Sequence, residues 1–271
     1  MGACMSKVDK ISDLQQIELN ILLDIDQFCK KHNITYYLGE GTLLGAIRHQ
    51  GFIPWDDDID ILMKREDYEK FLKLAPSKMD ADYEIQHSTT IKNYWSPFIK
   101  VRYLGKSLYK QQHIKHLTNH NGPCVDIFPL DYVPKQYSRA QYYQSLKIKF
   151  LRRTLSLKLG LTKKRSIKNS IMKFIGSFLC VKYIHNKLDK TFKKYKTGKY
   201  IANLGSYYSI KKQTFPSDYY DLPRYVSFEG NSLPIPNKAE TILSSIYGDY
   251  MQLPPEEKRV IKHHYNIDER E

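Results

Sequence analysis

The sequence predicts an α/β protein of the α+β type, in which a mixed sheet is flanked by helices and carries a basic helical insertion. Segments with a helical period alternate with short strand-like runs between residues 10 and 128. From residue 138 to about 199 the pattern changes to long basic helices. We therefore expect three parts, of which the third returns to the first: residues 1–137, 138–200 and 201–271.

The individual elements follow from apolar spacing and from Pro and Gly boundaries. Apolar residues on one helical stripe predict a helix over residues 10–31, which is interpreted as scaffold that covers the sheet. Period-two alternation predicts the strands: 36–38, 58–62, 83–86, 98–102, 107–109 and 124–128. Further helices are predicted at three places along the chain: 43–47, 65–74 and 239–247.

The net charge of +14 is concentrated in one segment. Between Ser145 and Tyr200, seventeen lysines and arginines accompany a single acid, Asp189, so this segment carries +16 and the remainder is close to neutral. An apolar block at 171–184 is too short and too charged to span a bilayer, and it is typical of an interfacial helix attracted to anionic lipid. A packed helical subdomain with a solvated basic rim is the alternative. No nucleic-acid recognition motif is present, so no nucleic acid partner is expected.

Cysteine usage and apolar content indicate where the protein works. The four cysteines are scattered without a Cys-x-x-Cys pair, which suits a reducing cytosol. No stretch reaches 18 apolar residues, and the N-terminus lacks a signal-peptide core. We expect a cytoplasmic protein, with peripheral contact at the inner face of the cell membrane through the basic segment.

A glycine-rich stretch indicates phosphate binding. Gly39-Glu40-Gly41-Thr42 reads as a turn that follows a short apolar run and opens the helix-like segment at 43–47. Glycines let a backbone approach a ligand closely, and a helix start offers N–H groups to an anion. Arginine binds phosphate oxygens in a bidentate manner, and Arg48 and His49 come just past the segment. The candidate phosphate-binding residues here are Gly39, Gly41, Thr42, Arg48 and His49.

An acidic stretch, Asp56-Asp57-Asp58-Ile59-Asp60-Ile61, follows about 15 residues later. Asp58 and Asp60 project from one face of the predicted strand. Two converging carboxylates repel each other, and a hard divalent cation such as Mg²⁺ or Mn²⁺ removes that penalty. Together with the glycine stretch, this pattern indicates metal-assisted phosphoryl chemistry on a nucleotidyltransferase-like fold. Asp126, in a hydrophobic–Asp–hydrophobic pattern, is the candidate for the third metal ligand or for the proton acceptor.

Three further features leave alternatives open. Lys100 and Arg102 share one strand face, which points either into the site, where they are candidate phosphate-binding residues, or to solvent. His113, His116, His120 and Cys124 have spacings compatible with zinc, and incidental histidines are the alternative. Asp131 is interpreted as structural, at a turn after Pro129.

The run from Gly39 to Phe71 closely resembles the signature of the LicD family, and the resemblance resumes at Val125–Asp131 and Tyr247–Pro255. Members of that family are bacterial proteins that resemble nucleotidyltransferases and decorate cell-surface glycans with phosphocholine. The fukutin-related proteins of animals look like distant relatives. The resemblance implies CDP-choline as donor, CMP as leaving group and a lipid-linked glycan acceptor of the teichoic acid, capsule or lipopolysaccharide type. Asp58, Asp60 and Asp126 would then hold metal and carry catalysis.

The resemblance leaves the transferred group open. Phosphoglycerol, phosphoribitol or phosphoethanolamine transfer, true nucleotidyl transfer and an inert membrane-surface scaffold are the alternatives. Choline requires aromatic faces, and the candidate choline or acceptor residues are Tyr94, Trp95, Tyr207 and Tyr208. His263 is placed at the site on resemblance alone.

Overall fold

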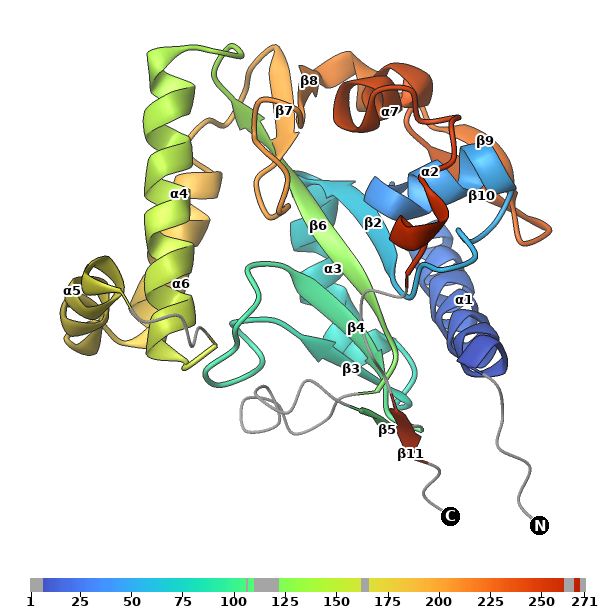
Figure 1. Ribbon diagram of the computed structural model, residues 1–271, viewed down its shortest axis with the longest axis horizontal. Helices are drawn as coiled ribbons and strands as arrows, with labels where there is room; N and C mark the ends of the chain where they lie inside the picture. Colours follow the sequence, from blue (N-terminus) through green and yellow to red (C-terminus); the bar gives the residue numbers. More distant parts are fainter. Residues whose placement is uncertain (1–6, 106, 110–121, 162–165, 261–265, 269–271) are drawn as a thin grey trace.

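The computed structural model describes residues 7–105, 107–109, 122–161, 166–260 and 266–268. It confirms the predicted class, because a mixed seven-stranded sheet is flanked by helices (Figure 1). Strands β1 (Tyr37–Leu38), β2 (Ile59–Lys64), β6 (Cys124–Val133), β4 (Ile99–Tyr103) and β3 (Tyr83–Gln86) lie side by side in that order. Strands β7 (Tyr200–Asn203) and β8 (Thr214–Pro216) extend the sheet from β6.

The ten-residue strand β6 is the axis of the molecule. Its first half pairs in parallel with β2 and antiparallel with β4, and its second half pairs antiparallel with β7. Because side chains alternate along a strand, Val125 and Ile127 enter the apolar core while Cys124, Asp126 and Phe128 face the opposite side. The sequence predicted only the first half of this strand. The predicted turn at Asp131 is wrong, since the strand continues to Val133.

Three helices complete the first half of the molecule: α1 (Lys7–Lys31), α2 (Glu40–His49) and α3 (Arg65–Lys78). Helix α1 packs against β2, β4 and β6 through its predicted apolar stripe, and α3 packs against β2, β3 and β6. Helix α2 begins at Glu40, three residues earlier than predicted, so the glycine stretch is the first turn of a helix rather than a separate turn.

The basic segment is helical, as predicted, and has its own small core. It comprises α4 (Arg139–Lys158), α5 (Ile167–Ser177) and α6 (Val181–Phe192). Helices α5 and α6 pack against α4, which lies to one side of the sheet (Figure 1). Apolar side chains from α4 and α6 meet those of Val133, Ala202 and Leu204. The end of β6 and the strand β7 therefore join this helical core to the sheet.

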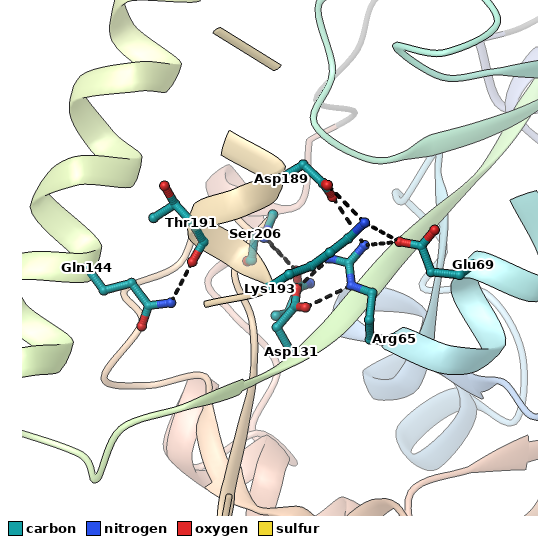
Figure 2. A network of polar contacts seen from close by, with 10 residues as sticks. Arg65, Glu69, Asp131, Gln144, Asp189, Thr191, Lys193 and Ser206 are labelled. Atoms are coloured by element: carbon teal, nitrogen blue, oxygen red, sulfur yellow. Dashed lines mark hydrogen bonds and ion pairs between the residues drawn. The ribbon is translucent and has the colours of Figure 1, made fainter. Parts of the chain in front are cut away.

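A polar network ties the two halves together (Figure 2). The guanidinium of Arg65, at the start of α3, donates to both carboxylate oxygens of Asp131 in β6, at 2.8 and 2.6 Å. Lys193, just past α6, pairs with Glu69 of α3 at 2.6 Å and with Asp189 of α6 at 2.8 Å. Burial alone would lower the pKa of Arg65, but its hydrogen bonds and charge interaction with Asp131 raise it.

The C-terminal elements return to the first half. They are η1 (Ser217–Tyr220), β9 (Arg224–Phe228), β10 (Asn231–Ile235), α7 (Ala239–Tyr247), η2 (Glu256–Lys258) and β11 (Asn266–Asp268). The β9–β10 hairpin and α7 pack around α2, and β11 pairs with β5 (Ser107–Tyr109). Within the part of the chain that the structure describes, no helix is long and apolar enough to cross a bilayer.

Candidate active site

The register of two parallel strands brings the predicted acids together. Asp60 of β2 lies opposite Asp126 of β6, and Asp58 immediately precedes β2. All three side chains line one cavity of about 1010 Å³, together with Gly41 at the start of α2. We call this the acidic cavity. The acids that line it come from five parts of the chain: Glu18, Glu40, Asp56, Asp57, Asp58, Asp60, Asp126 and Asp249. The bases that line it are fewer: Arg48, Lys100, Arg102 and Arg259.

The carboxylates are close enough to disfavour each other's charge. Oxygen atoms of Asp56, Asp57 and Asp58 all lie within 4.8 Å of one another. Two unit charges about 5 Å apart repel by roughly 3 kcal/mol at an effective dielectric constant near 20. Burial, followed by the charges of Asp58 and Asp126, raises the pKa of Asp60 well above its usual value. A set of carboxylate oxygens that repel in this way fits a hard divalent ion, which prefers oxygen ligands.

Asp126 has a cationic partner in the protein itself. Lys100 Nζ lies 2.5 and 2.6 Å from the two oxygens of Asp126, and the side chains are 10% and 15% exposed. Burial alone would lower the pKa of Lys100, but the carboxylate of Asp126 outweighs it and the pKa is raised. The face shared by Lys100 and Arg102 therefore points into the cavity and not to solvent. The thiol of Cys124 lies 3.7 Å from Asp126 on the same wall.

The glycine stretch packs against the segment that carries the acids. A Cβ on Gly41 would lie 2.6 Å from an oxygen of Asp56, and one on Gly39 would lie 2.6 Å from Cγ of Leu62. The buried Thr42 accepts a hydrogen bond from the backbone N–H of Asp60 at 2.9 Å. Only Gly41 of these three lines the cavity. The close approaches that these glycines permit are therefore to the protein's own side chains, Leu62 of β2 and Asp56 of the acidic stretch, and Thr42 fixes the strand that carries Asp60.

Glu40, at the first position of α2, is held in a rare conformation. Its backbone φ is +47°, a region that side chains other than glycine seldom occupy. One carboxylate oxygen accepts hydrogen bonds from Asn203 at 3.0 Å and from Gln213 at 2.6 Å. Burial raises the pKa of Glu40, and the hydrogen bonds from Gln213, Ser206 and Asn203 oppose that rise. Backbone strain of this kind concentrates at functional sites, where the surrounding structure maintains it.

Arg48 and Arg102 reach the cavity, whereas His49 does not line it. Arg48 donates to the backbone carbonyl of Tyr250 at 2.8 Å and, through Nε, to the ring of His49 at 3.0 Å. Burial, then the charge of Arg48, lowers the pKa of His49. Arg102 is buried and donates to Gln86 at 3.0 Å and to the carbonyl of Gly122.

The predicted aromatic residues fall into two groups. Trp95, Tyr207 and Tyr208 line the acidic cavity, and Tyr207 is 80% exposed. Tyr94 is fully buried and does not line the cavity. His263, His113, His116 and His120 lie outside the described residues. Among the described residues, the one group of metal-ligating side chains is Asp56, Asp57 and Asp58.

Several cavity residues were not predicted from the sequence. Glu18 of α1 is 3% exposed, and its Oε2 has no hydrogen-bond partner. Burial, then the negative charges of Cys124 and the nearby aspartates, raises its pKa. The signal was available, because Glu18 interrupts the apolar stripe of α1 between Leu14 and Leu22. Tyr247, Tyr250 and Arg259 enter the cavity from the C-terminal segment, where the family resemblance resumed without assigning them a role.

Comparison with known proteins agrees with this geometry. Residues 33–157 match the family model described as LicD/FKTN/FKRP, nucleotidyltransferase domain. The chain is 30% identical over 260 residues to the lipopolysaccharide cholinephosphotransferase LicD of Haemophilus influenzae, covering 93% of this chain and 96% of that protein. An uncharacterized protein of Rickettsia typhi is 40% identical over 80 residues, which cover 29% of this chain and 26% of that protein. An uncharacterized protein of Rickettsia prowazekii is 37% identical over 79 residues, which cover 29% of this chain and 30% of that protein. The resemblance read from the motifs is thus confirmed, and the chain belongs to the LicD family.

Proposed function

We propose that this protein is a transferase that moves phosphocholine from CDP-choline to a hydroxyl group of a cell-surface glycan precursor and releases CMP. The convergence of Asp58, Asp60 and Asp126 in one cavity carries the proposal. Its substrates are taken from a relative, a lipopolysaccharide cholinephosphotransferase, that aligns with nearly the whole chain. A group-transfer site of this kind must bind a diphosphate, accept a proton and recognise the transferred head group.

The diphosphate would lie among the acids and Arg48. Asp58 and Asp60, with Asp56 and Asp57 beside them, supply the oxygen ligands for Mg²⁺ or Mn²⁺. Such an ion, when bound, neutralises the diphosphate and stabilises the charge that develops on the departing CMP. Arg48 is fixed by the carbonyl of Tyr250, which orients its guanidinium for phosphate oxygens.

Asp126 would accept the proton in this mechanism. The acceptor oxygen attacks the phosphorus that bears choline, and its proton passes to Asp126. The bond from that phosphorus to the CMP oxygen breaks, and the electron pair leaves with CMP. The ion pair with Lys100 at 2.5 Å argues against metal ligation, because it already balances the charge of the carboxylate, and it fixes the position of Asp126 in the cavity.

The choline head group would contact aromatic rings at the cavity rim. Tyr208 and Tyr247 lie at 85° to each other with ring centroids 5.7 Å apart. Two perpendicular rings form two walls of a box, the arrangement that recognises quaternary ammonium ions. Trp95, with Lys100 Nζ 5.5 Å from its ring centre, and Tyr207, with the Arg152 guanidinium 5.0 Å from its ring centre, line the same cavity. Because of their perpendicular geometry, we take Tyr208 and Tyr247 as the choline-binding rings.

The experiment that tests the function is a screen of CDP-alcohols for CMP release in the presence of Mg²⁺ and a glycan acceptor. We expect CDP-choline to be the preferred donor and the product mass to increase by one phosphocholine. If CMP is released from CDP-glycerol, CDP-ribitol or CDP-ethanolamine and not from CDP-choline, the transferred group is the corresponding phospho-alcohol and not phosphocholine. A nucleotide found on the acceptor would overturn the proposed site of attack.

Metal binding is tested separately from turnover. Mg²⁺ at a hundred times its Kd should stabilise the protein by about 2.7 kcal/mol, which raises Tm by a few degrees. Asp58→Ala should remove this shift and leave the metal-free protein as stable as the original, because it relieves repulsion. Asp13→Ala, an exposed acid outside the cavity, is the matched control. An unchanged Mg²⁺ shift in Asp58→Ala would exclude this metal site.

The basic segment would bring the enzyme to an anionic membrane surface, where a lipid-linked acceptor resides. Helix α5 lies at the outer end of the helical segment (Figure 1). Three apolar side chains here are 56%, 67% and 75% exposed: Ile171 and Phe174 of α5, and Phe178 just past its end. Lys173 of α5 and Lys182 of α6 are exposed too. Exposed apolar rings next to positive charge are what an interfacial helix offers to anionic lipid.

Vesicle sedimentation tests this contact. We expect binding to vesicles with phosphatidylglycerol and little binding to pure phosphatidylcholine vesicles. The double change Phe174→Ser and Phe178→Ser should weaken binding, whereas Tyr143→Ser, an equally exposed ring on α4, should not. Equal sedimentation of all three proteins would exclude α5 as the contact.

A further inference from the structure

A second cavity adjoins the acidic cavity and is lined by a different kind of side chain. Its volume is about 460 Å³, and it lies between α4 and the segment after β7. Four residues line both cavities: Trp95, Ser206, Tyr207 and Tyr208. The two cavities therefore share one wall, so a ligand bound in this second cavity would lie next to the acidic cavity.

The charge of the second cavity is opposite to that of the first. Lys149, Arg152 and Arg153 of α4 line it, and among the residues that the structure describes no Asp or Glu side chain does. We call it the basic cavity. Its remaining lining is apolar or neutral, from Ile148, Leu155 and similar residues. Cations that line a cleft without acids among them attract an anion more strongly than the same charges would on a flat surface.

Arg152 is the central cation of this cavity. Its Nη1 donates to the carbonyl of Ser206 at 2.8 Å, and its guanidinium lies 5.0 Å from the ring centre of Tyr207. Burial lowers the pKa of Arg152, but a guanidinium keeps its charge at any physiological pH. No carboxylate in the described part of the chain forms an ion pair with it. A half-buried cation without an anionic partner loses part of its hydration, and an anionic ligand compensates for that loss.

The shared wall is held rigidly to the acidic cavity. Asn203 Oδ1 accepts hydrogen bonds from the backbone N–H groups of Gly205 and Ser206, both at 3.0 Å. The amide of the same Asn203 donates to Glu40 at the start of α2, and Gln213 donates to both Glu40 and Ser206. The spacing between Arg152 and the acids is therefore fixed by a continuous network of hydrogen bonds and not by a free loop.

From this geometry we infer that the basic cavity binds a phosphate group on the glycan acceptor, and that Arg152 positions the acceptor so that its hydroxyl enters the acidic cavity. The inference rests on the proposed phosphocholine transfer and names its acceptor class, a phosphorylated glycan. Trp95 and Tyr207 on the shared wall supply ring surface for a sugar. The phosphate has two sources, a sugar phosphate of the glycan or the diphosphate of its lipid carrier.

Binding without donor or metal tests the inference independently of turnover. The probes are glucose 6-phosphate and glucose for the first source, and farnesyl diphosphate for the second, measured by calorimetry or ligand-detected NMR on the full chain. We expect at least one phosphorylated probe to bind more tightly than glucose. Arg152→Gln should raise its Kd about tenfold, the loss of one bidentate charge-assisted contact. Lys149→Gln should raise it about threefold, and Lys147→Gln, on the same helix but outside both cavities, should not change it.

The two phosphorylated probes distinguish a sugar phosphate from the diphosphate of a lipid carrier. The probe whose Kd rises in Arg152→Gln identifies the group that the basic cavity binds. Lys149 is exposed, so Lys149→Gln keeps the test valid if Arg152→Gln fails to fold. Equal binding by the original protein and both variants would overturn the inference. The inference would also be overturned if Arg152→Gln lost as much affinity for CDP-choline as for the phosphorylated probe, because the basic cavity would then bind the donor. Failure of the proposed function would appear instead as an absence of CMP release, with probe binding intact.

In turnover, Arg152→Gln should raise KM for a phosphorylated acceptor about tenfold and leave kcat nearly unchanged. With an unphosphorylated acceptor, the variant and the original should have the same KM. A fall in kcat at saturating phosphorylated acceptor, with KM unchanged, would contradict a positioning role.

Discussion

Strand β6 carries two aspartates, five residues apart, and each forms an ion pair with a base from another strand or helix. Asp126 pairs with Lys100 at 2.5 Å, and Asp131 pairs with Arg65 at 2.6 Å. Because the interval is odd, the two carboxylates leave the strand on opposite faces. Asp126 enters the acidic cavity, whereas Asp131 lies between the sheet, α3 and α6 (Figure 2).

The difference between these two pairs shows that an ion pair does not reveal its own role. Asp131 is 2% exposed and receives a bidentate arginine, within a network that is closed by Glu69, Asp189 and Lys193. Asp126 is 15% exposed and receives a single ammonium group, among other acids and beside a large open volume. The first arrangement satisfies its charges internally. The second leaves room for a substrate.

The largest effect is expected from removing the charge of Asp126. Asp126→Asn should lower kcat by about 10³-fold, within the usual range for loss of a general base. Its free energy of unfolding should change by less than about 1 kcal/mol, because the other carboxylates of the acidic cavity remain to balance the charge of Lys100. Steady-state CMP release and urea denaturation measure the two quantities. Near-normal kcat in this variant would remove Asp126 from the mechanism.

The matching change at Asp131, on the other face of β6, should lower stability and leave kcat nearly unchanged. Asp131→Asn should lower the free energy of unfolding by about 3 kcal/mol, since it removes the bidentate carboxylate from the largely buried Arg65 and leaves only the longer contacts with Glu69 and Asp189. At temperatures where it is folded, kcat should stay within about twofold of the original. The exposed pair Lys64–Asp221 provides the control, and Asp221→Asn should cost less than about 1 kcal/mol. Equal destabilisation in both variants would contradict the comparison.

Lys100→Met sharpens the distinction between a proton acceptor and a metal ligand. If Asp126 acts as a base that Lys100 positions, kcat should fall by about tenfold to a hundredfold and the Mg²⁺-induced rise in Tm should persist. Adding Lys100→Met to Asp126→Asn should then have little further effect on kcat, because the two residues act as a unit. A Lys100→Met variant with increased Mg²⁺ affinity and full activity would instead place Asp126 in the metal site.

The smallest effect is expected from the pH dependence of the free energy of unfolding, through His87, which lies near the Arg65 network. Burial, and then the charge of His185, lowers the pKa of His87 to about 4. An unfolded histidine takes up its proton near pH 6.5, so the folded state binds fewer protons between these values. Stability should therefore fall by about 2 kcal/mol as pH decreases from 6.5 to 4. His87→Gln should flatten this part of the urea-midpoint profile, and an unchanged slope would exclude His87 as its cause.

Sequence reasoning recovered the parts of the site that are local. The helix at 10–31 and the strand of Asp60 follow from periodicity, and the position of Asp126 beside them follows from the resemblance to nucleotidyltransferases; the structure agrees with each. The register of β2 on β6 is more than a local property, but hydrophobic–Asp–hydrophobic patterns on both strands constrain it strongly.

The missed features depend on contacts between distant segments. Whether Gly41 contacts a ligand or the carboxylate of Asp56 is decided by how α2 packs against the acidic stretch. Thr42 is hydrogen-bonded to the backbone of Asp60 for the same reason. The pair between Lys100 and Asp126 requires the antiparallel register of β4 and β6, which no local pattern specifies. Likewise, the partner of Asp131 is 66 residues away in the chain.

Helix α1 was interpreted as a cover for the sheet, yet it also contributes to the cavity. Gln15 donates a hydrogen bond to the carbonyl of Asp56 at 2.8 Å, and Glu18, one turn further on, lines the cavity. Shortened versions of this protein for crystallisation should therefore keep the chain intact from the start of α1. Trimming it would remove a support of the acidic stretch, and the loss would be mistaken for poor expression or an inactive preparation.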